Sequence, residues 1–301
     1  MVQAVRRSAW HLWWPFALLC VLHGSRWLLS GSLPGSATTL ASASLGCGSA
    51  AALYLLIVRP SGLARLQHRD LLRSVLGGAL LITGPLISLF YPRTIAASSV
   101  TMALALTPVV IAVCEAATRH SSETLAGRLW PGLAAIAGLL LLLIQPSLSN
   151  PGVDLVLALT PLLTGCGAVL FCSARATIWR LPAALLGACA ALGLGAAINF
   201  ATHTGGWPEM AGLAAGFDAL EALLALIALS RLSATRWSAQ FAIVPLIVLL
   251  EGVVEIPARV PARMLVGLLL LAAAATALLI PPSEESRFDL RTSRPGPAHS
   301  D

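Results

Sequence analysis

Three carboxylates lie inside long apolar stretches of this sequence, where a charge is expensive. Asp218 and Glu221 fall in the stretch 210–230, and Glu251 falls in the stretch 237–256. A charged group at the centre of a transmembrane helix costs roughly 2.5 to 3.5 kcal/mol, so it normally faces other helices or a water-filled cavity. We therefore predict that these acids belong to a binding site inside a membrane protein.

Asp218 and Glu221 are three residues apart, so they share one face of a helix. Two carboxylates this close in a medium of low dielectric constant cannot both ionise cheaply, and we expect at least one of them to hold a proton. The pair is thus predicted to be a proton site. The alternative is that one acid pairs with Arg26 and only joins two helices.

Three other polar residues are candidates for the same site. The planar guanidinium of Arg26 suits a substrate carboxylate or phosphate, although the side chain could also reach the outer interface. His23 could relay a proton near neutral pH, or simply fill space, because no metal ligand is spaced to meet it. Thr164 shares a helical face with Thr160 beside Pro161, and could line a cavity or bond to a neighbouring helix.

Several residues are predicted to shape the backbone and the packing. Pro108 and Pro245 each remove a helical hydrogen bond and are predicted to act as hinges. Gly212 and Gly216 form a GxxxG pair that predicts close helix packing, and Asn199 is expected to make an interhelical hydrogen bond.

The composition excludes a soluble protein. Of the 301 residues, 57% are hydrophobic and 11% are charged, whereas soluble domains are about 25% charged. The net charge of +6 comes only from arginine, which is spread between the apolar runs, so nucleic-acid binding is not predicted. The six cysteines form no CxxC pair, and neither a metal site nor a disulfide framework is indicated.

Apolar stretches of nearly membrane-spanning length follow one another along almost the whole chain. A hydrocarbon core of about 30 Å needs about 20 apolar residues, and helices satisfy their own backbone in lipid. We predict ten transmembrane helices at 13–33, 38–58, 74–90, 94–114, 129–144, 153–174, 181–202, 210–230, 237–256 and 262–280.

The arginines predict how the chain is oriented. With the N-terminus inside, fifteen arginines fall on the cytoplasmic side and four on the outer side, so both termini are predicted to be cytoplasmic. Tryptophans near the span ends, such as Trp130, Trp179, Trp207 and Trp237, are predicted to anchor the helices at the headgroup level. Residues 1–9 form the cytoplasmic N-terminus, and the polar stretch 282–301 is predicted to be a disordered cytoplasmic tail.

An internal repeat divides the ten predicted helices into two sets. The segment 84–108 aligns without a gap on 221–245, so that Pro108 coincides with Pro245. Five helices per repeat is an odd number, so the repeats 10–144 and 153–281 must enter the membrane from opposite sides. The predicted fold class is an all-α integral membrane protein of ten transmembrane helices, built as two inverted five-helix repeats, which is the architecture of many secondary transporters.

Three stretches carry a resemblance to a known family. They are HGSRW (23–27), TPVVIAVCEAATRHSSETLAGRLWPGLAAIAGLLLLL (107–143) and VPLIVLLEGVVEIPARVPARMLVGLLLL (244–271). In the last two, a proline is followed by an apolar run, a loop with a glutamate nearby and a glycine-containing helix. With the span count and the repeat phase, they resemble the EamA family of the drug/metabolite transporter superfamily.

The resemblance implies a secondary active transporter that exports a small polar metabolite, such as an amino acid or a related compound. The buried acids suggest that export is coupled to protons. The expected partners are a small-molecule substrate, protons and the lipid bilayer of a bacterial cytoplasmic membrane, with no cofactor and no metal. A homodimer is left open.

Two other classes of function are weighed against transport. One is a non-transporting membrane partner or sensor that would use the loop 59–73 for contact. The other is a membrane-embedded enzyme, but no HExxH or GxSxG motif occurs in the sequence, and we predict that the protein is not an enzyme.

Overall fold

The computed structural model describes residues 13–24, 36–59, 67–90, 95, 97–119, 125–142, 151–202, 212–252 and 262–280. These residues form helices joined by short turns, with no strand among them. The first helix is Trp13–Gly24, here named the N-terminal helix. The others are α2 (Ser36–Val58), α3 (His68–Leu86), the 3-10 helix η3 (Ile87–Phe90), α4 (Ala97–Leu104), α5 (Thr107–Arg119), α6 (Leu125–Leu142), α7 (Pro151–Ser173), α8 (Arg180–Thr202), α9 (Gly212–Arg231), α10 (Ala234–Trp237), α11 (Gln240–Gly252) and α12 (Ala262–Leu279).

Six of the described stretches are long and apolar enough to cross a membrane. Leucine and isoleucine side chains on their outer faces are exposed, as Leu56 and Leu269 are at 70% each, which suits contact with lipid. These helices indicate a membrane protein, and two shorter apolar helices, Trp13–Gly24 and Leu129–Leu142, accompany them. The six stretches are Thr38–Val58, His68–Leu89, Ser99–Thr118, Pro151–Ser173, Arg180–Thr202 and Ala262–Leu279.

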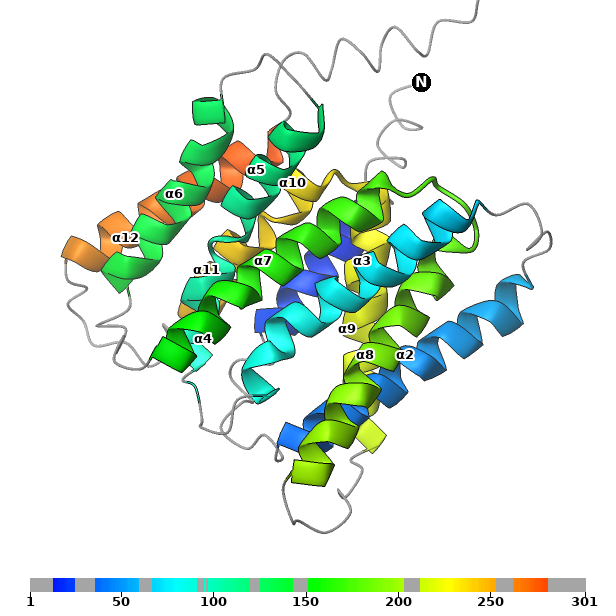
Figure 1. Cartoon of the computed structure of the whole chain (residues 1–301). Helices are drawn as coiled ribbons and strands as arrows, with labels where there is room; N and C mark the ends of the chain where they lie inside the picture. Colours follow the sequence, from blue (N-terminus) through cyan, green and yellow to red (C-terminus); the bar gives the residue numbers. More distant parts are fainter. Residues whose placement is uncertain are drawn as a thin grey trace, which may run out of the picture.

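The helices pack in two groups, each of which mixes both predicted repeats (Figure 1). On one side, α2 and α3 of the first repeat pack against α7, α8 and α9 of the second. On the other side, α5 and α6 pack with each other, and α12 packs on α6 and on α11. The helix α5 also packs against α7 and so connects the two groups. The two predicted repeats are therefore interleaved rather than side by side.

Helix lengths repeat along the chain. Helices α2 and α8 both have 23 residues, and α6 and α12 both have 18. Helix α12 begins at 262, which is 137 positions after the start of α6 at 125, and α10 begins at 234, which is 137 positions after the start of α4 at 97. The alignment of 84–108 on 221–245 has the same offset. These matched starts agree with an internal repeat, while its inverted orientation stays a prediction.

Close helix contacts use glycines at particular crossings. A Cβ placed on Gly78 of α3 would collide with the backbone carbonyl of Ala184 on α8. Helix α9 approaches α2 through Gly46, where a Cβ would lie 2.6 Å from the Ala215 carbonyl oxygen. In contrast, a Cβ on Gly216 would meet no atom of the described residues within 4 Å, so none of the described helices packs closely on this glycine.

Two predicted spans are interrupted in the structure. The fourth breaks at 105–106 between α4 and α5, and the ninth breaks at 238–239 between α10 and α11. Pro108 is the second residue of α5, where its missing N–H leaves the carbonyl of Leu104 without a helical donor and ends α4. Pro245 lies inside α11, several residues after the second break. A hinge role for either proline stays a prediction.

Candidate functional site

A cavity of about 80 Å³ lies where seven helices meet. Residues of the N-terminal helix, α2 and α3, from the first predicted repeat, line this cavity. Residues of α7, α9, α10 and α11, from the second predicted repeat, line it as well. About 10 to 15 Å³ of such volume accommodates one water, so the cavity has room for several waters or one small polar molecule. Four of the six residues predicted for substrate or proton binding line it: His23, Thr164, Asp218 and Glu221.

His23 and Glu221 are in direct contact at the cavity wall. Nδ1 of His23 lies 3.0 Å from Oε1 of Glu221, and the two side chains are 20% and 19% exposed. The next residue, Gly24, lets the end of the N-terminal helix approach α11, since a Cβ there would lie 3.0 Å from Cγ2 of Ile247. His23 thus has a carboxylate partner, which the sequence alone did not predict for it.

Asp218 lies one helical turn before Glu221 on α9 and is 8% exposed. Both carboxylates line the cavity, as their spacing predicted. A buried carboxylate is stable only when it is protonated, paired or hydrogen-bonded. The cavity wall therefore carries two acids, one turn apart on α9, and the imidazole of His23 at the end of the N-terminal helix.

Thr164 is 1% exposed and lines the cavity from α7. Its hydroxyl donates to the carbonyl oxygen of Thr160 over 2.8 Å, one turn earlier in the same helix. Gly84 of α3 packs against this side chain, and a Cβ on Gly84 would collide with the Thr164 hydroxyl. Because the hydroxyl of Thr164 already donates its hydrogen within α7, it can only accept a hydrogen bond from a ligand.

Two predicted site residues have no described side chain. Arg26 lies outside the described residues. Glu251 belongs to α11, but the surroundings of its side chain are also outside what the structure describes. Asn199, by contrast, is described: its Nδ2 donates to the carbonyl oxygen of Leu89 over 3.2 Å, which confirms the predicted interhelical hydrogen bond.

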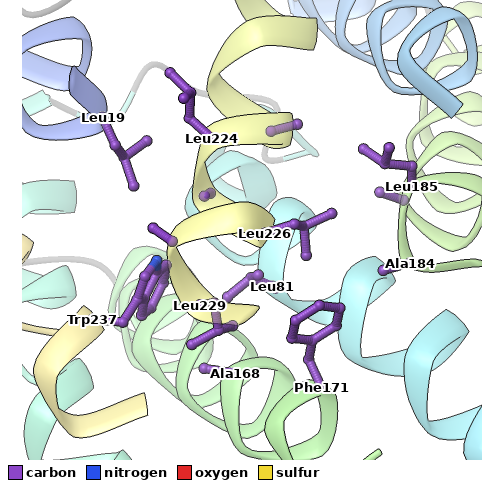
Figure 2. Packing of buried hydrophobic residues seen from close by; sticks show 14 of the residues in the cluster. Leu19, Leu81, Ala168, Phe171, Ala184, Leu185, Leu224, Leu226, Leu229 and Trp237 are labelled. Carbon is purple, nitrogen blue, oxygen red and sulfur yellow. The ribbon is translucent and has the colours of Figure 1, made fainter. Parts of the chain in front are cut away.

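Three neutral residues at the break between α10 and α11 also line the cavity. Gln240, Trp237 and Phe241 are all at least 94% buried. The rings of Trp237 and Phe241 meet edge to face, with centroids 5.4 Å apart. Trp237, 3% exposed, belongs to the core, so its predicted role as an interface anchor is wrong; Figure 2 shows it packed near Leu229 of α9.

Gln240 and Phe241 also touch a second, smaller cavity of about 10 Å³ together with His23. Thr101 and Leu104 of α4 and Val244 and Pro245 of α11 also line it. His23, Gln240 and Phe241 therefore form a partition between the two cavities. Sequence reasoning overlooked Gln240 because it searched for charges, yet a glutamine inside an apolar stretch was a usable signal.

A buried acid outside the cavity was also missed. Glu115 on α5 is 8% exposed, and its Oε2 accepts a hydrogen bond from the Thr235 hydroxyl of α10 over 3.3 Å. Glu115 does not line the cavity. It directly follows the predicted end of the fourth span at position 114.

The comparisons with known proteins show a fold that is shared with a solved structure. No family model matches the chain, and no curated protein sequence matches it. One solved structure, described as "Crystal structure of protein", is similar over 93% of this chain and 98% of its own, with a TM-score of 0.61 and 16% sequence identity. This similarity shows that the chain shares its overall fold, over nearly its full length, with a protein whose crystal structure is known.

Proposed function

We propose that this protein is a proton-coupled secondary transporter of the EamA type, which exports a small polar metabolite, such as an amino acid or a related compound, across a bacterial cytoplasmic membrane. The observation that carries the proposal is the contact between His23 and Glu221 in the wall of a cavity. Ionisable residues within membrane helices generally mark substrate or ion pathways.

The composition of the cavity wall supports transport. The N-terminal helix, α2 and α3 belong to the first predicted repeat, and α7, α9, α10 and α11 belong to the second. In transporters built from repeats, substrate sites lie at the repeat interface, and access alternates when one group of helices moves against the other. A relative movement of the two helix groups would open this cavity to one side at a time.

The polar residues support coupling to protons. When Glu221 is ionised it attracts a protonated His23, and when Glu221 binds a proton this attraction is lost. Asp218, also in the wall, can bind a second proton or a cationic substrate. If substrate and protons compete for these acids, binding of one releases the other, which is the requirement for exchange.

Flux measurements test the proposal. The purified protein in proteoliposomes should exchange one or more members of an amino-acid and amine panel, faster with an imposed pH gradient than after its collapse by an ionophore. Glu221→Gln should reduce this coupled flux at least about tenfold, since it removes the proton site. Glu115→Gln, which changes a buried acid outside the cavity, serves as the matched control and should retain flux.

Two results would contradict the proposal. Flux that is insensitive to the pH gradient would exclude proton coupling. The absence of flux for the whole panel, together with comigration of a second protein in native gels of the membrane, would instead support a non-transporting partner.

A further inference from the structure

The smaller cavity, of about 10 Å³, lies where both interrupted spans break. Leu104, the last residue of α4, lines it just before the break at 105–106, and Gln240 and Phe241, the first residues of α11, line it just after the break at 238–239. Leu104 and Phe241 occupy matched positions in the alignment of 84–108 on 221–245. The smaller cavity therefore lies between corresponding segments of the two predicted repeats.

The backbone around this cavity lacks two helical donors. Pro108 and Pro245 have no N–H, so neither can donate to the carbonyl oxygen four residues earlier, which is that of Leu104 or of Phe241. In membrane helices, ordered waters help to satisfy the carbonyl groups that a proline frees. The volume of about 10 Å³ is close to what one buried water needs, and Thr101 adds a hydroxyl to the wall. The smaller cavity thus has the size and the polar groups of a site for one water.

His23 lies between this water site and Glu221. The imidazole lines both cavities, and its Nδ1 is 3.0 Å from Oε1 of Glu221, within the reach of direct proton transfer. Glu221 lines the larger cavity but not the smaller one. Among the described residues that line either cavity, the titratable groups are His23, Glu221, Asp218 and Cys47, and His23 is the one that both cavities share.

We propose that a water in the smaller cavity and the imidazole of His23 form a proton path to Glu221 that is separate from the larger cavity. A hydronium ion formed at this water gives a proton to Nε2 of neutral His23. The resulting imidazolium gives its Nδ1 proton to the carboxylate of Glu221, which leaves a neutral imidazole with its proton on Nε2. Rotation of the ring, or the same two transfers in reverse, restores the starting tautomer.

Such a path gives a displaced proton an exit. In the proposed exchange, substrate that binds the acids of the larger cavity releases a proton, and the bound substrate then fills the volume of about 80 Å³ that water would otherwise occupy. Through His23 the proton leaves by the smaller cavity while the substrate stays bound. The purpose of the path rests on the proposed function, but the path itself can be measured without substrate.

Infrared spectroscopy of the full chain in lipid nanodiscs provides this measurement. The carbonyl band of protonated Glu221 is identified by its loss in Glu221→Gln. Its shift after rapid mixing with D₂O gives the rate at which the acid exchanges its proton. Ile82→Phe is the reference variant, because Ile82 lines the larger cavity and not the smaller one. We expect Ile82→Phe to exchange this proton at a rate close to that of the wild type.

Changes in the smaller cavity should slow the exchange. Added to Ile82→Phe, Leu104→Phe fills the smaller cavity with the side chain that the matched position 241 already has. It should lower the rate at least about tenfold, since a positioned proton relay contributes about 10²- to 10⁴-fold. Thr101→Val, which removes a hydroxyl at nearly constant volume, should also lower the rate and replaces Leu104→Phe if that variant fails to fold. His23→Gln should lower the rate as far as Leu104→Phe does, because both interrupt the same path.

In proteoliposomes the same variants separate proton coupling from substrate binding. Leu104→Phe alone should lose the acceleration by a pH gradient. It should still exchange labelled for unlabelled substrate, because that exchange moves no net proton. Ile82→Phe should instead weaken the exchange of substrate, because the added bulk takes up space in the larger cavity.

The contrary outcomes are distinct. If Ile82→Phe alone slows the infrared exchange tenfold or more, about the loss expected for a blocked relay, protons enter through the larger cavity and the inference is overturned. An unchanged rate after Leu104→Phe or Thr101→Val is added would overturn it as well, as would the absence of a protonated Glu221 band at every pH at which the protein is folded. If the infrared rates are as expected but proteoliposomes show no flux, the path holds and the transport proposal fails. Proton-coupled flux that Leu104→Phe leaves unchanged would give the reverse result.

Discussion

His23, at the end of the N-terminal helix, contacts Glu221 in the middle of α9, with Nδ1 and Oε1 3.0 Å apart. This contact connects the N-terminal helix, the first of the described helices, to a helix of the second predicted repeat. Both side chains also line the cavity, so the link lies at the surface that a ligand would touch. A ligand or proton that binds Glu221 must therefore change the interaction between Glu221 of α9 and His23 of the N-terminal helix.

The contact predicts that His23 and Glu221 act as one unit. We expect His23→Gln and Glu221→Gln each to reduce proton-coupled flux, and the double variant to be no worse than the more damaging single variant. The physical reason is that either change already removes the interaction, and residues in contact are not additive. Initial rates in proteoliposomes give the comparison, and additive losses would show that the two side chains work separately.

The glycine contacts predict opposite effects of one type of substitution. Gly78→Ala places a methyl group against the carbonyl of Ala184, so α3 and α8 must separate, and we expect a loss of about 1 to 3 kcal/mol in the free energy of unfolding. Gly216→Ala meets nothing within 4 Å and should stabilise α9 by up to about 1 kcal/mol. Thermal unfolding in the same detergent compares the two. Similar losses for both would contradict the close crossing at Gly78.

The sequence predicted the site better through its charges than through its neutral residues. Acids in apolar stretches pointed to Asp218 and Glu221 because burying a charge needs a compensating environment. The partner of His23 depended on how distant helices pack, which no local pattern contains. Gln240 and Trp237 have no charge, so their burial without hydrogen-bond partners among the described residues is visible only in the structure.

The helix pattern was predictable in outline but not in its interruptions. Among the described residues, six helices are long and apolar enough to cross a membrane and two apolar ones are shorter, so the count of ten stays a prediction. The breaks at 105–106 and 238–239 fall inside two of the predicted stretches. The GxxxG pair shows a similar limit. The spacing of Gly212 and Gly216 defines a face of the helix, but it does not say whether a neighbour packs there, and no described residue comes within 4 Å of a Cβ placed on Gly216.

The two prolines predict different effects of substitution by alanine. Pro245 lies inside α11, where it leaves the carbonyl of Phe241 without its helical donor, so Pro245→Ala should raise the free energy of unfolding by up to about 3 kcal/mol. Pro108 lies in the first turn of α5, where an N–H is not needed, so Pro108→Ala should change stability by less than about 1 kcal/mol. If Pro245 is a hinge, Pro245→Ala should also slow flux. A stabilised variant with unchanged flux would exclude that role.

Cys114 and Cys166 predict a cross-link that reports on helix movement. Their Sγ atoms lie 3.8 Å apart on α5 and α7, the helix pair that connects the two groups of helices. We expect copper phenanthroline to oxidise the two thiols to a disulfide, seen as the loss of two maleimide-reactive sites, and to inhibit flux until a reductant is added. Inhibition follows because a bond of about 2 Å between the sulfur atoms holds α5 against α7. Cys114→Ser provides the control, since it cannot form the bond and should remain active after oxidation. Full flux in the cross-linked wild type would show that α5 and α7 move together during transport.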